Sequence, residues 1–157
     1  MIRTDKRIRC CSVLLALNLL LIWGNSLLPG EISGMISGYV TEIVGKLLGM
    51  GLSESAGGHG LLRKLAHFSE FACLGALLTW RLSMAGHSGG NLKSRTLLGG
   101  LSTACLDETI QIFVEGRGSS LIDVWIDFCG AAAGMMILLI GYSFVKNRKQ
   151  FTFWRKQ

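Results

Sequence analysis

The sequence predicts an all-α integral membrane protein: a bundle of four transmembrane helices with an amphipathic helix at its outer face. Half of the 157 residues are hydrophobic, and they fall into four long blocks. A block of about 20 apolar residues is long enough to cross a bilayer as a helix. The chain also has 21 glycines, and glycine is common where membrane helices pack through small residues. We treat residues 1–157 as a single membrane domain.

The first span is predicted at residues 12–28, which contain a nearly continuous apolar block at 13–23. A basic start followed by an apolar stretch also describes a signal peptide. The segment Gly24-Asn25-Ser26 offers a small-x-small cleavage pattern, so cleavage of the first span stays open. The basic residues that precede this span are Arg3, Lys6, Arg7 and Arg9.

Residues 31–50 have the periodicity of an amphipathic helix rather than of a span. One face would carry Ile32, Ile36, Tyr39, Ile43 and Leu47, and the other Glu31, Gly34, Gly38, Glu42, Gly45 and Lys46. Such a helix lies in a membrane interface with its apolar face toward the acyl chains. We therefore expect it at the outer interface or folded back over the bundle. A glycine- and serine-rich connection follows at 49–60.

The other three spans are predicted at residues 61–82, 95–113 and 121–145. Most of the basic residues mark one side of the membrane, and cytoplasmic loops are the ones enriched in Lys and Arg. They comprise the N-terminal group, Arg81, Lys93 and Arg95, and the C-terminal group Lys146, Arg148, Lys149, Arg155 and Lys156. This distribution predicts that both termini are cytoplasmic. It also explains the net charge of +6 as an orientation signal, and it argues against nucleic-acid binding.

Ionisable and polar residues interrupt three of the four spans. They are Lys64, His67 and Glu70 in the second, Asp107, Glu108 and Gln111 in the third, and Asp123 and Asp127 in the fourth. A charge at membrane depth costs several kcal/mol, so such residues normally face a bundle interior and serve a function. Almost none lies in the cytoplasmic half of the spans, which counts against a proton-linked transporter.

The depths of these residues agree between helices. With a rise of 1.5 Å per residue, His67, Asp107 and Asp127 each lie about 9 Å below the outer end of their span. On the fourth span Asp127 shares one face with Gly130 and Gly134, a glycine spacing that permits close helix packing. The sequence therefore predicts one inward-facing polar layer. Purely structural polar contacts between helices are the alternative interpretation.

The acidic residues of this layer outnumber its cations, so the excess negative charge needs compensation. Three ways remain open: protonation of some carboxyl groups, a divalent cation, or a cationic group of a ligand. The sequence does not decide whether a metal or cofactor is present. Arg117 lies in the segment Gly116-Arg117-Gly118-Ser119-Ser120, just before the fourth span. It would either hold a phosphate or carboxylate near the helix N-terminus or pair with Asp123 or Glu115 and fix the loop.

Three segments together resemble the VanZ-like family of bacterial membrane proteins. They are Lys64-Leu-Ala-His67-Phe-Ser-Glu70-Phe71, then Asp107-Glu108-Thr-Ile-Gln111-Ile-Phe113, then Gly116-Arg117-Gly-Ser-Ser120-Leu-Ile-Asp123-Val-Trp-Ile-Asp127-Phe-Cys-Gly130. The resemblance covers about the last 100 residues. It implies a cell-envelope role in the bacterial cytoplasmic membrane, since the founding member is associated with low-level resistance to teicoplanin. The family commonly has proline at 115 and asparagine at 127, so Glu115 and Asp127 make this site more acidic than is typical.

Two functions follow as hypotheses. In the first, an outer-leaflet site binds a lipid headgroup or a glycopeptide through five ligand-binding residues: Lys64, Gln111, Arg117, Asp123 and Asp127. In the second, the protein is a membrane-embedded and metal-dependent hydrolase or transferase that acts on a lipid-linked envelope substrate. Its catalytic residues would be His67, Glu70, Asp107 and Glu108, with His67 or Glu70 as the general base. The expected partners are membrane lipids or lipid-linked envelope molecules.

Overall fold

A computed structural model describes residues 2–48 and 58–154, and this part of the chain folds as five helices without a strand. The helices are α1 (Ile2–Ser26), α2 (Gly30–Leu48), α3 (Gly58–Met84), α4 (Gly89–Ile112) and α5 (Leu121–Trp154). The glycine-rich connection at 49–57 and the basic residues Arg155 and Lys156 lie outside the described residues. So do the side chains of Arg3, Leu47, Lys146, Arg148 and Lys149.

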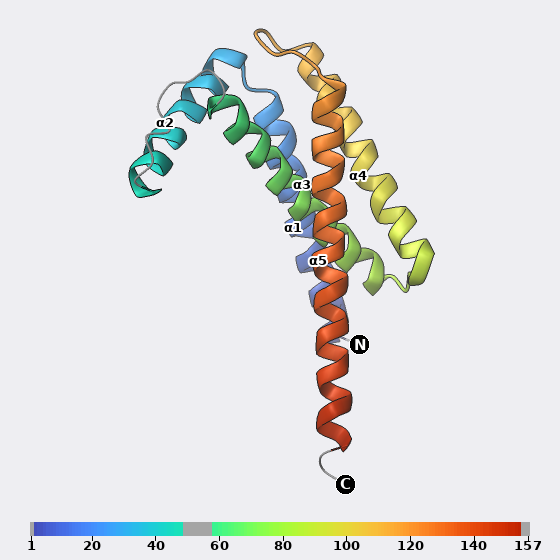
Figure 1. The fold of residues 1–157 in the computed structure, drawn as a ribbon. Coiled ribbons are helices and arrows are strands. Elements are labelled where there is room, and N and C mark those ends of the chain that lie inside the picture. The colour runs from blue at the N-terminus through green and yellow to red at the C-terminus, as the bar shows by residue number, and fades with distance from the viewer. Residues whose placement is uncertain (1, 49–57, 155–157) are drawn as a thin grey trace.

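Four helices form an up-and-down bundle, and α2 lies beside one end of it (Figure 1). α1 begins and α5 ends toward the same end of the bundle, which we call the basic end. The α1–α2 junction, the start of α3 and the α4–α5 loop lie toward the opposite end, which we call the acidic end. Each of the five predicted helices is present in the described residues, and the predicted all-α class is confirmed. The bounds differ by a few residues: α1 ends at Ser26 and α4 at Ile112, and residues 58–60, predicted as part of the connection, begin α3.

The breaks between helices follow from the local sequence. Pro29 has no amide hydrogen and cannot continue α1, and its carbonyl oxygen accepts the first bond of α2 from the Ser33 amide, at 3.0 Å. Gly116 has a φ of 72° in the α4–α5 loop, a backbone conformation that costs glycine little. Both breaks lie at the acidic end, so they position the residues of the candidate site.

Two of the described helices are long and apolar enough to cross a membrane: α1 over Lys6–Ser26 and α5 over Leu121–Phe144. α3 and α4 do not meet the same standard of length and hydropathy; they carry the ionisable residues of the predicted polar layer. Four helices are therefore present where four spans were predicted. By length and composition, two of them, α1 and α5, are candidate membrane spans.

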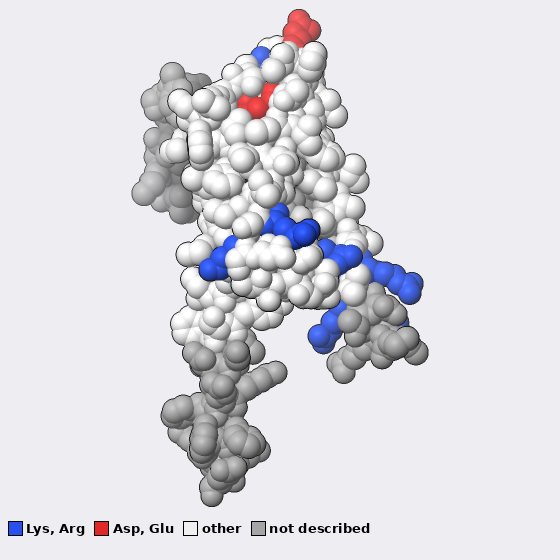
Figure 2. Space-filling view, turned by 90° about the vertical axis from the view of Figure 1, so that its right-hand side faces the viewer, with Lys and Arg blue, Asp and Glu red and all other residues white. Residues whose placement is uncertain are grey.

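The distribution of side chains is inverted relative to a water-soluble protein. Among the described residues, eleven polar or charged side chains are buried against eight hydrophobic ones. Large apolar side chains cover the outside instead, for example Leu20 at 66 % and Ile137 at 69 % exposure. A soluble monomer rarely exposes apolar side chains so extensively. In the view of Figure 2, a broad surface without charged side chains separates acidic groups near one end from a belt of Lys and Arg.

The packing of α3 against α5 is the most extensive of any pair of described helices. A side chain at Gly134 would collide with the carbonyl oxygen of Ala72, and one at Gly75 with that of Ala131. A side chain at Gly130 would meet the Phe68 carbonyl oxygen at 2.5 Å. The prediction that Gly130 and Gly134 form the packed face of this helix is therefore confirmed. We call these contacts the glycine seam.

Candidate functional site

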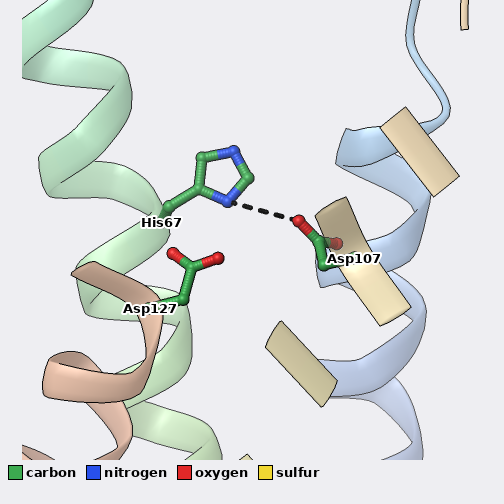
Figure 3. A group of neighbouring side chains, drawn as sticks. All are labelled: His67, Asp107 and Asp127. Atoms are coloured by element: carbon green, nitrogen blue, oxygen red, sulfur yellow. Dashed lines mark ion pairs between the residues drawn. The ribbon is translucent and has the colours of Figure 1, made fainter. Parts of the chain in front are cut away.

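Three ionisable side chains from three different helices meet near the acidic end of the bundle. His67 comes from α3, Asp107 from α4 and Asp127 from α5, and their ligand atoms all lie within 4.8 Å of one another (Figure 3). The three residues are 8 %, 0 % and 1 % exposed. The His67 Nδ1 atom lies 3.9 Å from Asp107 Oδ2. The predicted polar layer thus contains a compact cluster, which we call the His–Asp–Asp cluster.

Asp107 has hydrogen-bond donors on both of its carboxylate oxygens. The Ser26 hydroxyl at the end of α1 donates to Oδ1 at 2.7 Å, and the Gln111 side-chain amide donates to Oδ2 at 3.0 Å. Both donors are buried. Donors on both oxygens stabilise the ionised form of a carboxyl group and fix its orientation. Asp107 is therefore held rigidly with its Oδ2 atom toward His67.

Asp127 is buried without such help. Neither of its carboxylate oxygens has a hydrogen-bond partner in the described part of the chain, and the same is true of the His67 Nδ1 atom. Buried polar atoms normally have a partner, and an unpaired one costs about 1–3 kcal/mol. The cluster therefore combines one well-bonded carboxylate with two groups whose polar atoms face one another unpaired.

Glu108 supports the start of α5 instead of joining the cluster. Its Oε2 atom accepts a bond from the Ser120 main-chain amide at 2.7 Å, and its Oε1 atom accepts one from Gln111 at 3.2 Å. A carboxylate beside the first turn of a helix is stabilised by the unpaired amides and the helix dipole. Gln111 thus joins the two neighbouring acids of α4, which accounts for its burial at 5 % exposure.

Glu70 is not a member of the His–Asp–Asp cluster. Its Oε1 atom accepts a hydrogen bond from the Asn25 side chain at 3.2 Å, while its Oε2 atom is buried without a partner among the described residues. The Asn18 side chain donates to the Glu70 main-chain oxygen at 3.4 Å. Two asparagines of α1 therefore fix this part of α3.

Arg117 ties the α4–α5 loop to the α1–α2 junction. Its Nε atom donates to the Leu28 carbonyl at 3.0 Å and an Nη atom donates to the Asn25 carbonyl at 2.6 Å. Burial lowers the pKa of this guanidinium from its ordinary value, but arginine remains protonated in proteins. The contacts are to main-chain carbonyls, not to Asp123 or Glu115 as one interpretation of the sequence held. They give Arg117 a role in fixing the loop, and its role in ligand binding stays a prediction.

A small polar pocket opens beside the cluster. It is lined by the three polar residues Lys64, Gln111 and Asp123, by the cluster residues His67 and Asp127, and by Arg63, Glu108 and Ile126. Lys64 Nζ lies 3.4 Å from Asp123 Oδ1, at ion-pair distance but without hydrogen-bond geometry. The volume that the centre of a water molecule can occupy there is about 10 Å³, close to the minimum for one water. The pocket therefore suits one water or one ion rather than a whole headgroup.

The structure brings most of the predicted site residues together and adds three. Glu108, Gln111, Lys64 and Asp123 surround the His–Asp–Asp cluster, whereas Glu70 and Arg117 contact the end of α1. The sequence analysis missed Ser26, Asn25 and Arg63 as members of the site. Arg63 directly precedes Lys64 at the start of α3, and that adjacency was the available signal. Nothing in the sequence of α1 indicated which of its polar residues would reach α4.

The cluster can serve chemistry that needs a nitrogen and carboxylate oxygens converging on one point. Imidazole and carboxylate together bind divalent cations such as Zn²⁺ and Mn²⁺. Without a metal, a histidine beside carboxylates can transfer a proton. Both uses benefit from side chains that neighbouring hydrogen bonds hold in place, as Ser26 and Gln111 hold Asp107.

Comparison with known proteins assigns the chain to a family. The family model VanZ/LLP1 matches residues 13–142, a range that runs from α1 through most of α5 and contains every residue of the site. No curated protein and no solved structure matches the chain. The match covers most of the sequence, and it agrees with the resemblance carried by the segments around His67, Asp107 and Asp127. The chain therefore belongs to the VanZ/LLP1 family.

Proposed function

We propose that the chain crosses the cytoplasmic membrane of a bacterium four times, with both termini in the cytoplasm. The apolar exterior and the composition of α1 and α5 support a membrane location. The belt of Lys and Arg in Figure 2 supports a cytoplasmic basic end, because positive residues are retained on that side. The acidic end, with the His–Asp–Asp cluster, then faces the outer leaflet.

We further propose that the acidic end binds the anionic headgroup of an envelope lipid. A pocket between α2 and α3, with a cavity volume of about 120 Å³, carries this proposal. Its lining has two components: the polar residues Asn25, Ser33, Ser37 and Arg63, and the apolar residues Ile36, Val40, Leu62 and Ala66. A lipid has the same two parts, an anionic head and apolar chains. Arginine with hydroxyl groups is well suited to bind phosphate oxygens.

Arg63 links this pocket to the small polar pocket, because it lines both. Among the described residues, no carboxylate lies within ion-pair distance of its guanidinium. Lys64 beside it is 42 % exposed on its side chain and only loosely paired with Asp123. An anionic headgroup held by Arg63 would thus lie next to the His–Asp–Asp cluster. The neighbouring α2 presents apolar side chains such as Met35 and Tyr39, which would contact the acyl chains.

The lipid proposal gives a route to the envelope phenotype of the founding family member. A protein that holds or presents an anionic lipid at the outer surface changes the lipid-linked molecules available there. Reduced access of teicoplanin to its target would be one consequence. A glycopeptide bound directly at the acidic end is the competing form of the proposal, and the following experiment distinguishes the two.

The test is native mass spectrometry of the full-length protein released from nanodiscs that contain phosphatidylglycerol and phosphatidylcholine. We expect wild type to retain phosphatidylglycerol selectively and Arg63→Gln to lose that selectivity. The matched control is Arg95→Gln, since Arg95 is an exposed arginine at the basic end whose one side-chain hydrogen bond within the described chain is to Asn91 on its own helix. Equal retention of both lipids by wild type would overturn the proposal. Binding of added teicoplanin without any lipid preference would favour the glycopeptide instead.

A second candidate function is an enzyme that acts on a lipid-linked envelope substrate. The specific observation in its favour is the convergence of His67, Asp107 and Asp127, with unpaired atoms on two of them. In this function His67 would be the general base, and the headgroup bound at Arg63 would carry the reacting bond. Incubation with envelope lipids followed by product analysis tests it. Turnover that Asp107→Asn abolishes in a folded protein would establish the enzyme; binding without product would exclude it for the lipids used.

A further inference from the structure

We propose that His67, Asp107 and Asp127 form a binding site for one divalent transition-metal ion, of the class of Zn²⁺ or Mn²⁺. The inference goes beyond headgroup binding, because it concerns the buried cluster and not the cationic pocket of Arg63. The ligands would be the Nδ1 atom of His67, the Oδ2 atom of Asp107 and one oxygen of Asp127 (Figure 3).

The separations of the ligand atoms are close to those that a metal imposes. In a tetrahedral site with bonds of about 2.0–2.1 Å, two ligand atoms lie roughly 3.3 Å apart. The distance from His67 Nδ1 to Asp107 Oδ2 is 3.9 Å, and all three ligand atoms lie within 4.8 Å. The ligand atoms thus lie up to about 1.5 Å farther apart than in a tetrahedral site, so metal binding requires the three side chains to draw together around the ion.

The unpaired polar atoms are an independent indication of a ligand. His67 and Asp127 are more than nine-tenths buried, and the Nδ1 atom and both Asp127 oxygens lack any partner within the described chain. The His67 Nδ1 atom faces Asp107, and the Asp127 carboxylate lies beside His67 with one oxygen on the side of Asp107 (Figure 3). A cation between them would bond both groups at once. It would also balance the two carboxylate charges, which no described lysine or arginine pairs with directly.

Asp107 already has the surroundings of a metal ligand. Ligating carboxylates are normally held by hydrogen bonds from a second layer of residues, and Ser26 and Gln111 provide such bonds at 2.7 and 3.0 Å. The two donors leave the Oδ2 atom directed toward His67. The adjacent pocket has room for about one water, so it can supply a further, exchangeable ligand. A site with three protein ligands and one open position is typical of catalytic metal sites.

The experiment measures metal binding to the full-length protein in detergent, after treatment with EDTA and without added lipid. Dialysis against ZnCl₂ or MnCl₂ followed by elemental analysis should give one ion per wild-type chain. Asp127→Asn and His67→Ala should weaken binding by more than the roughly 10–100-fold typical of a lost outer-layer partner. Glu115→Gln, which removes a carboxylate from the exposed loop, should bind as wild type does. Circular dichroism and gel filtration verify that each variant is folded.

Co²⁺ provides a second readout that needs no disabled variant. Wild type should give the intense visible absorption of a four- or five-coordinate Co²⁺ site, and Asp127→Cys should add a thiolate-to-metal charge-transfer band. Failure of wild type to bind either metal, or only the weak spectrum of hydrated Co²⁺, would overturn the proposal. Folded Asp127→Asn and His67→Ala proteins with wild-type affinity would overturn it as well. Headgroup binding can be measured in EDTA, so the two proposals fail separately.

Discussion

The helix pair α3–α5 changes character along its length. Toward the acidic end these helices contribute His67 and Asp127, and α4 adds Asp107 between them. Further along, at the glycine seam, the same two helices touch through backbone atoms, with Gly134 against Ala72 and Gly75 against Ala131. The first region buries polar atoms that lack partners within the described chain. In the second region glycines lie directly against the backbone of the other helix, so no added side chain fits there. The seam thus fixes the backbones that hold the unfavourable cluster together.

This comparison predicts that the seam tolerates change least. Gly134→Ala adds one methyl group that collides with the Ala72 carbonyl oxygen, so the helices must move apart. Overpacking a core costs about 1–3 kcal/mol and sometimes more, and a backbone collision belongs at the upper end of that range. We expect a large fall in the thermal unfolding temperature, which circular dichroism of the protein in detergent measures.

The matched control is Gly141→Ala on the same helix, because a side chain at Gly141 would meet nothing within 4 Å. It should leave the unfolding temperature unchanged or raise it slightly, since alanine is the better helix former. Equal destabilisation by both changes would mean that α3 and α5 do not touch at the seam. The division of the helix pair into two regions would then be wrong.

The next largest effect is expected where the loop at the acidic end is anchored. Arg117→Ala removes the hydrogen bonds to the Asn25 and Leu28 carbonyls. Hydrogen bonds to charged groups are worth about 1.5–3 kcal/mol each, and exposure reduces that value, so we expect a loss of about 2–3 kcal/mol. Hydrogen exchange should increase in residues 25–30 and 113–120. Unchanged exchange there would show that the close contact of Gly30 with Gly116 holds the loop without Arg117.

A third prediction compares the stability of two variants, one at each aspartate of the cluster, in metal-free buffer. Asp107→Asn places an amide group against the donors Ser26 or Gln111 and should destabilise the protein by about 1–2 kcal/mol. Asp127→Asn removes a buried charge that has no described partner, so it should be neutral or stabilising. Unfolding temperatures measured in EDTA compare them. Destabilisation by both variants to the same degree would show that Asp127 has a partner that the structure does not contain.

Added metal sharpens the same comparison, because a ligand that binds only the folded state stabilises it. ZnCl₂ or MnCl₂ should raise the unfolding temperature of wild type and not that of Asp127→Asn. The order of stability of these two proteins would then reverse between EDTA and metal. A parallel rise in both proteins would place the metal elsewhere.

Much of this arrangement follows from the sequence because it depends on periodicity and length. The four bundle helices and α2 lie where the apolar blocks and the amphipathic pattern predicted them. Counting the helical rise from the ends of the spans predicted a common depth for His67, Asp107 and Asp127, and these residues do meet. The spacing of Gly130 and Gly134 indicated the packed face of α5. Each inference needs only one helix and its direction.

The remaining parts depend on which helix faces which, and a single helix does not encode that. The rotation of α1 decides that Ser26 reaches Asp107 and that Asn25 reaches Glu70. Cys11, Asn18 and Asn25 recur every seven residues and so share one face of α1. This pattern indicates a packed face but does not say which helix that face meets. Arg117 was weighed against the nearby acids Asp123 and Glu115, but it bonds to carbonyls about 90 positions away in the chain. Glu70 and His67 share a face of α3, but Glu70 contacts Asn25 of α1 whereas His67 lies beside Asp107 of α4.

The smallest expected effect tests the hydrogen bond that joins Ser26 of α1 to Asp107 of the cluster. Ser26→Ala removes the 2.7 Å hydrogen bond to Asp107 Oδ1 and should cost about 1 kcal/mol. A change this small leaves the seam intact, so any larger loss would mean that α1 positions α4 as a whole. If Asp107 binds a metal, losing this donor should also weaken that affinity about tenfold, as outer-layer changes do. Titration of Zn²⁺ into wild type and Ser26→Ala measures this. Equal affinities would mean that Gln111 alone orients Asp107, so that α1 contributes to stability but not to the site.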